Sequence, residues 1–157
     1  MTLSITYQEL QQLVADKLHK NIELQYASNQ AIKFTLHTAI KKIVTINVDC
    51  SAELKLSIYG NDLYVDYDVL PFENVKSGTL SGFIDSVVPN VVNLALNYLT
   101  NKYPQYNNII EKVPDTERLR IHLAAIPQLQ TILQHVMINS ITPQEDGLQI
   151  VAHLKNK

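Results

Sequence analysis

The sequence has only one cysteine, Cys50, and no excess of basic residues. A single cysteine cannot close a disulfide within the chain, and it has no neighbour at metal-ligand spacing, so a disulfide framework and a zinc site are both excluded. A net charge of -2 and a pI near 6.2 leave no positive surplus for a phosphate backbone. We therefore expect Cys50 to be a small core residue, and we expect no nucleic acid partner.

A secretory signal and long apolar runs are missing as well. No positive cluster followed by an apolar run begins the sequence, which predicts a cytoplasmic protein, or a periplasmic one if a leader has been removed. The most apolar stretch, residues 79 to 103, never approaches the roughly 18 uninterrupted apolar residues of a membrane span. It is interrupted at Asp85, Pro89, Asn90, Asn93 and Asn97. This stretch is predicted to be a soluble helix.

Catalytic and nucleotide-binding motifs are also lacking. There is no Gly-x-Gly-x-x-Gly or Walker loop, and residues 78 to 82 lack the Gly-x-Ser-x-Gly spacing. We therefore expect no enzyme and no cofactor. Two weaker alternatives are a calcium or acid/base site and a metal site with histidine ligands, although solvated surface positions are the simpler interpretation of both. Their candidate residues are Glu53, Asp66 and Asp68 for the first, and His122, His135 and His153 for the second.

At 157 residues and 46% hydrophobic content, the chain suits one filled core, so residues 1–157 are predicted to form a single domain. A helix is expected to begin at Thr6, because Thr6 and Glu9 have the spacing of a capping box, and to end near His19 or Lys20. Apolar and polar residues alternate over 22–26 and 32–37, which is typical of two half-exposed strands.

Residues 52 to 69 contain the clearest hairpin, with Gly60 and Asn61 as its two-residue turn. This turn fixes a register in which one face is apolar and the other polar. The apolar pairs are Ile58 with Leu63, Leu56 with Val65, Leu54 with Tyr67, and Ala52 with Val69. The first strand extends back to about residue 43, so we expect it to bend or bulge near Ser51.

The C-terminal third predicts a strand, a short helix and a final hairpin. Leu119 and Ile121 alternate with Arg118 and Arg120, as in a strand. Pro127 suits the first turn of a helix. Residues 136–141 and 148–154 flank a loop and are expected to pair, with an inward set of Leu148, Ile150, Ala152 and Leu154.

The apolar residues of 79 to 103 recur at helical spacing and form one continuous stripe. Pro89 predicts a kink in this helix, because proline removes a backbone donor and clashes with the preceding turn. Strands joined by short turns and interrupted by one long helix predict an α+β fold. We expect a strongly curved antiparallel sheet wrapped around one long kinked helix, with a short N-terminal helix and a second short helix.

Several residues resemble the YceB-like family of small bacterial lipoproteins. They are the segment from Leu3 to Leu10, the alternating hairpin, and Pro89, Asn93, Ala95, Leu96, Tyr98, Pro104 and Tyr106. That family resembles the tubular lipid-binding superfamily, in which a curved sheet wraps a long helix. The resemblance implies binding of a lipid or another apolar molecule and no activity. The family's lipoprotein signal with its acylated cysteine is missing here.

The favoured hypothesis is non-enzymatic binding of a lipid or other apolar small molecule in a groove between the long helix and the curved sheet. The expected lining is Phe83, Val87, Val91, Leu94, Ala95 and Tyr98, with Arg118 and Arg120 as headgroup contacts through charge-assisted hydrogen bonds. The alternative is a protein-interaction or dimerisation module with a closed core and no ligand, whose surplus apolar surface meets a partner or a second copy.

Overall fold

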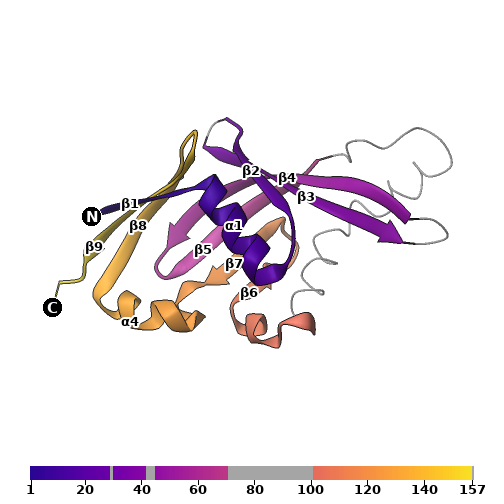
Figure 1. The fold of residues 1–157 in the computed structure, drawn as a ribbon. Coiled ribbons are helices and arrows are strands. Elements are labelled where there is room, and N and C mark those ends of the chain that lie inside the picture. Colours follow the sequence, from indigo (N-terminus) through magenta and orange to yellow (C-terminus); the bar gives the residue numbers. More distant parts are fainter. Residues whose placement is uncertain (29, 42–44, 71–100, 157) are drawn as a thin grey trace.

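The computed structural model describes residues 1–28, 30–41, 45–70 and 101–156, which form two antiparallel sheets with short helices beside them (Figure 1). The elements are, in chain order, β1 (Thr2–Thr6), α1 (Tyr7–Leu18), β2 (Ile22–Tyr26), β3 (Ala31–Lys41), β4 (Thr45–Tyr59), β5 (Asp62–Val69), the 3₁₀ helix η2 (Pro104–Asn108), β6 (Ile110–Lys112), β7 (Arg118–His122), the 3₁₀ helix η3 (Leu123–Ala125), α4 (Pro127–His135), β8 (Val136–Pro143) and β9 (Gly147–Leu154).

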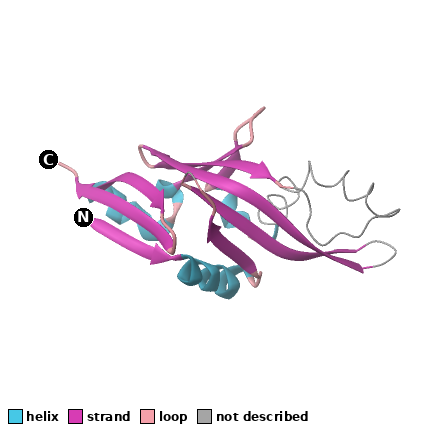
Figure 2. Cartoon of the chain, turned by 90° about the horizontal axis from the view of Figure 1, so that it is seen from above, coloured by secondary structure: helices cyan, strands magenta, loops and turns pink. Residues whose placement is uncertain are grey.

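The smaller sheet has the strand order β1-β9-β8, and the larger one has the order β2-β3-β4-β5-β7-β6. The first and last strands of the chain are therefore direct neighbours, with Leu3 opposite Ile150 and Thr6 opposite Gly147. Seen from above, β1 lies along one margin of the smaller sheet and leads straight into α1 (Figure 2).

The prediction of one strongly curved sheet wrapped around a long kinked helix is wrong. The described residues are mostly strand and divide into sheets of three and six strands, and the α-helices among them, α1 and α4, have only 12 and 9 residues. The tubular lipid-binding architecture, its hydrophobic groove and the lipoprotein-like character implied by the resemblance are not supported by this arrangement. Residues 71–100, which hold most of the predicted helix, lie outside the described residues.

The predicted start of the first helix is confirmed. The Thr6 hydroxyl oxygen accepts a hydrogen bond from the Glu9 amide at 3.0 Å, and the Glu9 carboxylate accepts one from the Thr6 amide at 2.8 Å. This reciprocal pair satisfies two of the donors that a helix start leaves free. The helix ends where His19 adopts a left-handed conformation with φ 54°.

The predicted hairpin register is confirmed at every pair. β4 and β5 place Ile58 opposite Leu63 and Ala52 opposite Val69, with Leu56–Val65 and Leu54–Tyr67 between them. Of the bend or bulge expected near Ser51, the bulge is wrong, because β4 pairs with β3 in continuous register through Ser51. The irregularity lies instead in β8, between Ile138 and Ser140. The bend stays a prediction.

The final hairpin is confirmed as β8 and β9, but its expected inward set is only partly right. Ala152 is buried, whereas Leu154, at the end of β9, is 70% exposed. Cys50 is buried, as predicted. The core lies between the apolar faces of the strands, where Ile32 of β3 and Val65 of β5 are buried.

Candidate functional site

Charged side chains gather on the polar face of the larger sheet, across β5, β7 and β6. The register places Asp62 opposite His122, Tyr64 opposite Arg120, and Asp66 opposite Arg118. β6 adds Glu111, which stands opposite Arg120. Because paired residues of neighbouring strands point to the same face, these side chains form one layer, which we call the charged cluster: Asp62, Tyr64, Asp66, Glu111, Arg118, Arg120 and His122.

Asp62 is the centre of the charged cluster. Its Oδ2 atom accepts hydrogen bonds from Arg120 Nη2 at 2.7 Å and Nε at 3.1 Å, and its Oδ1 atom lies 3.0 Å from His122 Nδ1. The Glu111 carboxylate contacts the same two partners from β6, with Oε1 3.3 Å from His122 Nε2 and 3.5 Å from Arg120 Nη1. The cluster therefore ties three strands together through side chains.

The second half of the charged cluster is a bidentate ion pair between Arg118 and Asp66. Arg118 Nε donates to Asp66 Oδ1 at 2.6 Å, and Arg118 Nη2 donates to Asp66 Oδ2 at 3.2 Å. The Tyr64 ring lies under both guanidiniums, with its centroid 5.2 Å from Arg118 Cζ and 5.9 Å from Arg120 Cζ. Such stacking adds a cation–π attraction to the ion pairs.

The pKa shifts agree with this geometry. Hydrogen bonds from Arg120 lower the pKa of Asp62, against a smaller opposing effect of burial. Hydrogen bonds to Asp66 and Asp62 raise the pKa of Arg118 and Arg120, respectively. Both arginines are thus engaged by carboxylates of their own sheet, and the headgroup role expected for them stays a prediction. The expected apolar lining, Phe83, Val87, Val91, Leu94, Ala95 and Tyr98, lies outside the described residues.

Neither of the two alternatives forms a metal site among the described residues. Glu53, Asp66 and Asp68 share the polar face of the hairpin, as predicted, whereas His135 ends α4 and the other two histidines lie in different sheets. His122 is in the larger sheet, while His153 is in the smaller sheet and lies 2.6 Å from Asn139 Oδ1 through its Nδ1. Asp66 is held by Arg118, while Glu53 stands opposite Asp68 in the hairpin. Within the part of the chain that the structure describes, no group of three or more metal-ligating side chains could hold an ion.

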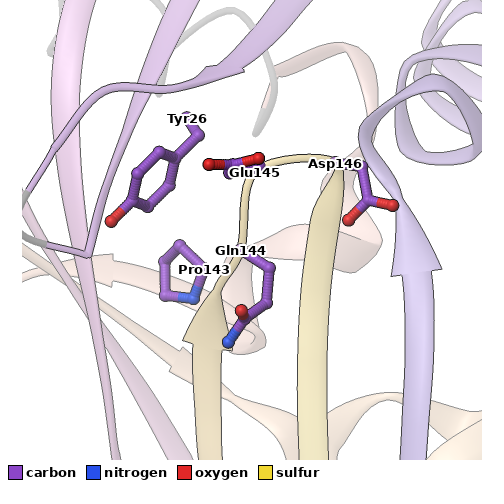
Figure 3. A pocket seen from close by; sticks show the side chains of 5 residues that line it. All are labelled: Tyr26, Pro143, Gln144, Glu145 and Asp146. Atoms are coloured by element: carbon purple, nitrogen blue, oxygen red, sulfur yellow. The ribbon is translucent and has the colours of Figure 1, made fainter.

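An open cleft of about 540 Å³ lies between the end of β2 and the β8–β9 turn, with Tyr26 on one side and the turn on the other (Figure 3). Its lining residues are Tyr26, Pro143, Gln144, Glu145 and Asp146. Ligand pockets are usually lined mostly by apolar groups, whereas this cleft carries two carboxylates and an amide. It therefore does not provide the apolar groove that the sequence predicted.

Among the described residues, the edge strands are β1 and β8 in the smaller sheet and β2 and β6 in the larger one, and they differ in how they are protected. β6 carries Glu111 and Lys112, and β8 has an irregularity between Ile138 and Ser140 and ends at Pro143. On β2 the amide of Leu24 donates to the Gln11 side chain of α1 at 2.8 Å, and Glu23 adds a charge to the strand. On β1 there is no charged residue and no proline, and Leu3 is 56% exposed. Because natural edge strands usually carry a charge, a proline or a cover, β1 is the unusual margin. Sequence reasoning missed it, although the alternation of Leu3 and Ile5 with hydroxyl residues was its signal.

No family model, no curated protein and no solved structure matches the chain. The resemblance to the YceB-like family therefore stays a prediction. Over the described residues, no helix has both the length and the apolar character that crossing a bilayer requires.

Proposed function

We propose that this chain is a non-enzymatic protein-interaction module that pairs through β1 with β1 of a second copy. The observation that carries the proposal is the outer side of β1, an uncharged edge with an exposed leucine. Main-chain hydrogen bonds at such an edge give affinity, and the alternate side chains give specificity.

The backbone groups that face outward follow from the pairing with β9. The Ala152 amide donates to the Met1 carbonyl at 2.9 Å, so the groups of Met1 point toward β9. In an antiparallel pair this direction alternates, so Leu3 and Ile5 also point inward. The amides and carbonyls of Thr2 and Ser4 therefore point outward, where a further strand would bind.

The register of the second copy follows from the same alternation. Thr6 also points outward, but its amide is already bound by Glu9. A two-fold axis beside Leu3 avoids Thr6, because it pairs Thr2 with Ser4 of the second copy. In that register Leu3 meets its own counterpart and Met1 meets Ile5, so apolar side chains face one another.

Proline at position 4 tests the backbone contact. Ser4→Pro removes an outward amide without removing a bond to β9, a position where edge strands tolerate proline. Sedimentation velocity over a concentration series is expected to show a dimer for the wild type, a monomer for Ser4→Pro and a dimer for Ser4→Ala, which keeps the amide. A wild type that is monomeric at every concentration contradicts the proposal.

Glutamate at position 3 tests the apolar contact. Leu3→Glu places two like charges at the axis and is expected to give a monomer. Leu13→Glu is the matched control, because Leu13 of α1 is 51% exposed against 56% for Leu3, and it is expected to stay dimeric. Equal weakening of both variants would mean that β1 is not the interface. Binding of an unrelated extended peptide by a monomeric wild type would assign the edge to a different partner.

A further inference from the structure

We propose that His37 forms a proton-dependent bridge, the His37 bridge, which links the edge strand β2 to β3 and β4. Its contact with β2 weakens as the pH rises. His37 lies in the larger sheet, so its role is independent of the pairing proposed for β1.

His37 stands on β3 between two carboxylates from the strands on either side. Its Nδ1 atom lies 2.6 Å from Asp49 Oδ1, directly opposite on β4. Its Nε2 atom lies 3.2 Å from Glu23 Oε1 on β2, and the His37 amide donates to the Asn21 carbonyl at 3.4 Å. One ring therefore spans the strands β2, β3 and β4.

This arrangement requires a protonated ring. An imidazolium has two N–H donors, so it can donate to both carboxylates, whereas a neutral imidazole has one donor and one acceptor. After loss of a proton, one ring nitrogen turns a lone pair toward a carboxylate oxygen. The shorter contact, with Asp49, is expected to keep the remaining proton, and Glu23 is the partner that is released.

The charged groups that act on the ring are Asp49 and Glu23. The hydrogen bond to Asp49 raises the pKa of His37 most, the one to Glu23 raises it further, and burial opposes both. Further along the same face, Lys33 of β3 stands opposite Glu53 of β4, beyond the Thr35–Ser51 pair. Because the pKa of His37 is raised, the His37 bridge is complete below the ordinary value of 6.5. It is lost as the pH rises through the higher pKa of the folded protein.

His122 provides an internal comparison. It too contacts two carboxylates, those of Asp62 and Glu111, but Arg120 contacts both of them as well. Because an arginine keeps its charge between about pH 5.5 and about pH 8.5, the contacts of Arg120 with Asp62 and Glu111 hold this part of the sheet together throughout that range. Only the His37 bridge is expected to give its strand a pH response.

Hydrogen exchange of the full chain tests the His37 bridge. Between about pH 5.5 and about pH 8.5, the protection factors of the Glu23 and Gln25 amides, corrected for intrinsic exchange, are expected to fall about two- to fivefold, the range for an exposed ion pair. In His37→Gln and in Glu23→Gln this response is expected to disappear. In His122→Gln it is expected to persist.

NMR titration of the ring gives a second readout that does not depend on stability. The His37 midpoint is expected above 6.5 and is expected to move down in Glu23→Gln. Unchanged β2 protection in the wild type, the same fall in His37→Gln, or a His37 midpoint at or below the ordinary value would each overturn the proposal.

Discussion

Asp62 and Arg120 are held together although 58 positions separate them in the sequence, with Arg120 Nη2 2.7 Å and Nε 3.1 Å from the same carboxylate oxygen. The pair joins β5 to β7 on the polar face, next to the hairpin turn. The Asp62 side chain is only 22% exposed, against 46% for Asp66, so water screens this ion pair less than it screens the pair of Arg118 with Asp66.

Replacing Asp62 is expected to change how stability depends on acidity. Because its pKa is lowered, the Asp62 carboxylate stabilises the fold fully above its ordinary value of 3.8 and loses this effect as the pH falls through the folded value. Asp62→Asn should cost about 1 kcal/mol at neutral pH and less at about pH 2, below the ordinary pKa of the carboxyl group. Urea unfolding at both pH values measures the difference.

The matched control for that experiment is Asp68→Asn. Asp68 is exposed and stands opposite Glu53, so removing its charge relieves a repulsion and should leave stability unchanged or slightly higher. An Asp62→Asn cost that is equal at both pH values would show that the carboxylate acts through packing rather than charge.

The two glycines Gly147 and Gly60 are expected to respond differently to alanine. A Cβ at Gly147 would overlap the carbonyl oxygen of Ile5 and lie 2.7 Å from the Thr6 Cα, so β1 and β9 would have to move apart, at a cost of about 3 kcal/mol. At Gly60 there is free space, and only its φ of +62° is unfavourable for alanine, at about 1 kcal/mol. Thermal unfolding of both variants tests this order, and equal costs would contradict it.

Cys50 is expected to be inert in the native protein. Burial, helped by the charge of Asp49, raises its pKa from 9.0 to about 11, which lowers the reactive thiolate fraction about a hundredfold at neutral pH. Labelling by a disulfide reagent should be slow in buffer and fast in urea. Similar rates in both conditions would show that the thiol is accessible.

Thr6 and Glu9 are expected to be energetically coupled. Each side chain binds the other residue's amide, so Thr6→Ala should cost about 1 kcal/mol. The double variant should cost less than the sum of the single ones. A double-mutant cycle in urea measures this coupling, and strictly additive costs would mean that the two bonds act separately.

The β4–β5 hairpin could be predicted because its information is local. The Gly60 turn fixes which residues face each other, and a shift by one residue would have exposed Leu54 and buried Lys55. The first helix was predictable for the same reason, since Thr6 and Glu9 are only three residues apart.

Division into two sheets could not be predicted from such patterns. Alternation tells which face of a strand is apolar, but the pairing of Leu3 with Ile150 depends on contacts across almost the whole chain. The same limit applies to the charged cluster. Arg118 and Arg120 were correctly assigned to one strand, yet their partners come from β5 and β6. No local spacing in the sequence predicts these partners.

The bond from the Leu24 amide to Gln11 has a consequence for how far assembly can proceed. An outward amide that is already occupied cannot recruit another molecule, so β2 is a poor place for growth. In a dimer joined through β1, both copies bury the same edge strand, because a two-fold contact buries identical surfaces. Association of this kind is self-limiting: it stops at a pair and does not extend into a fibre.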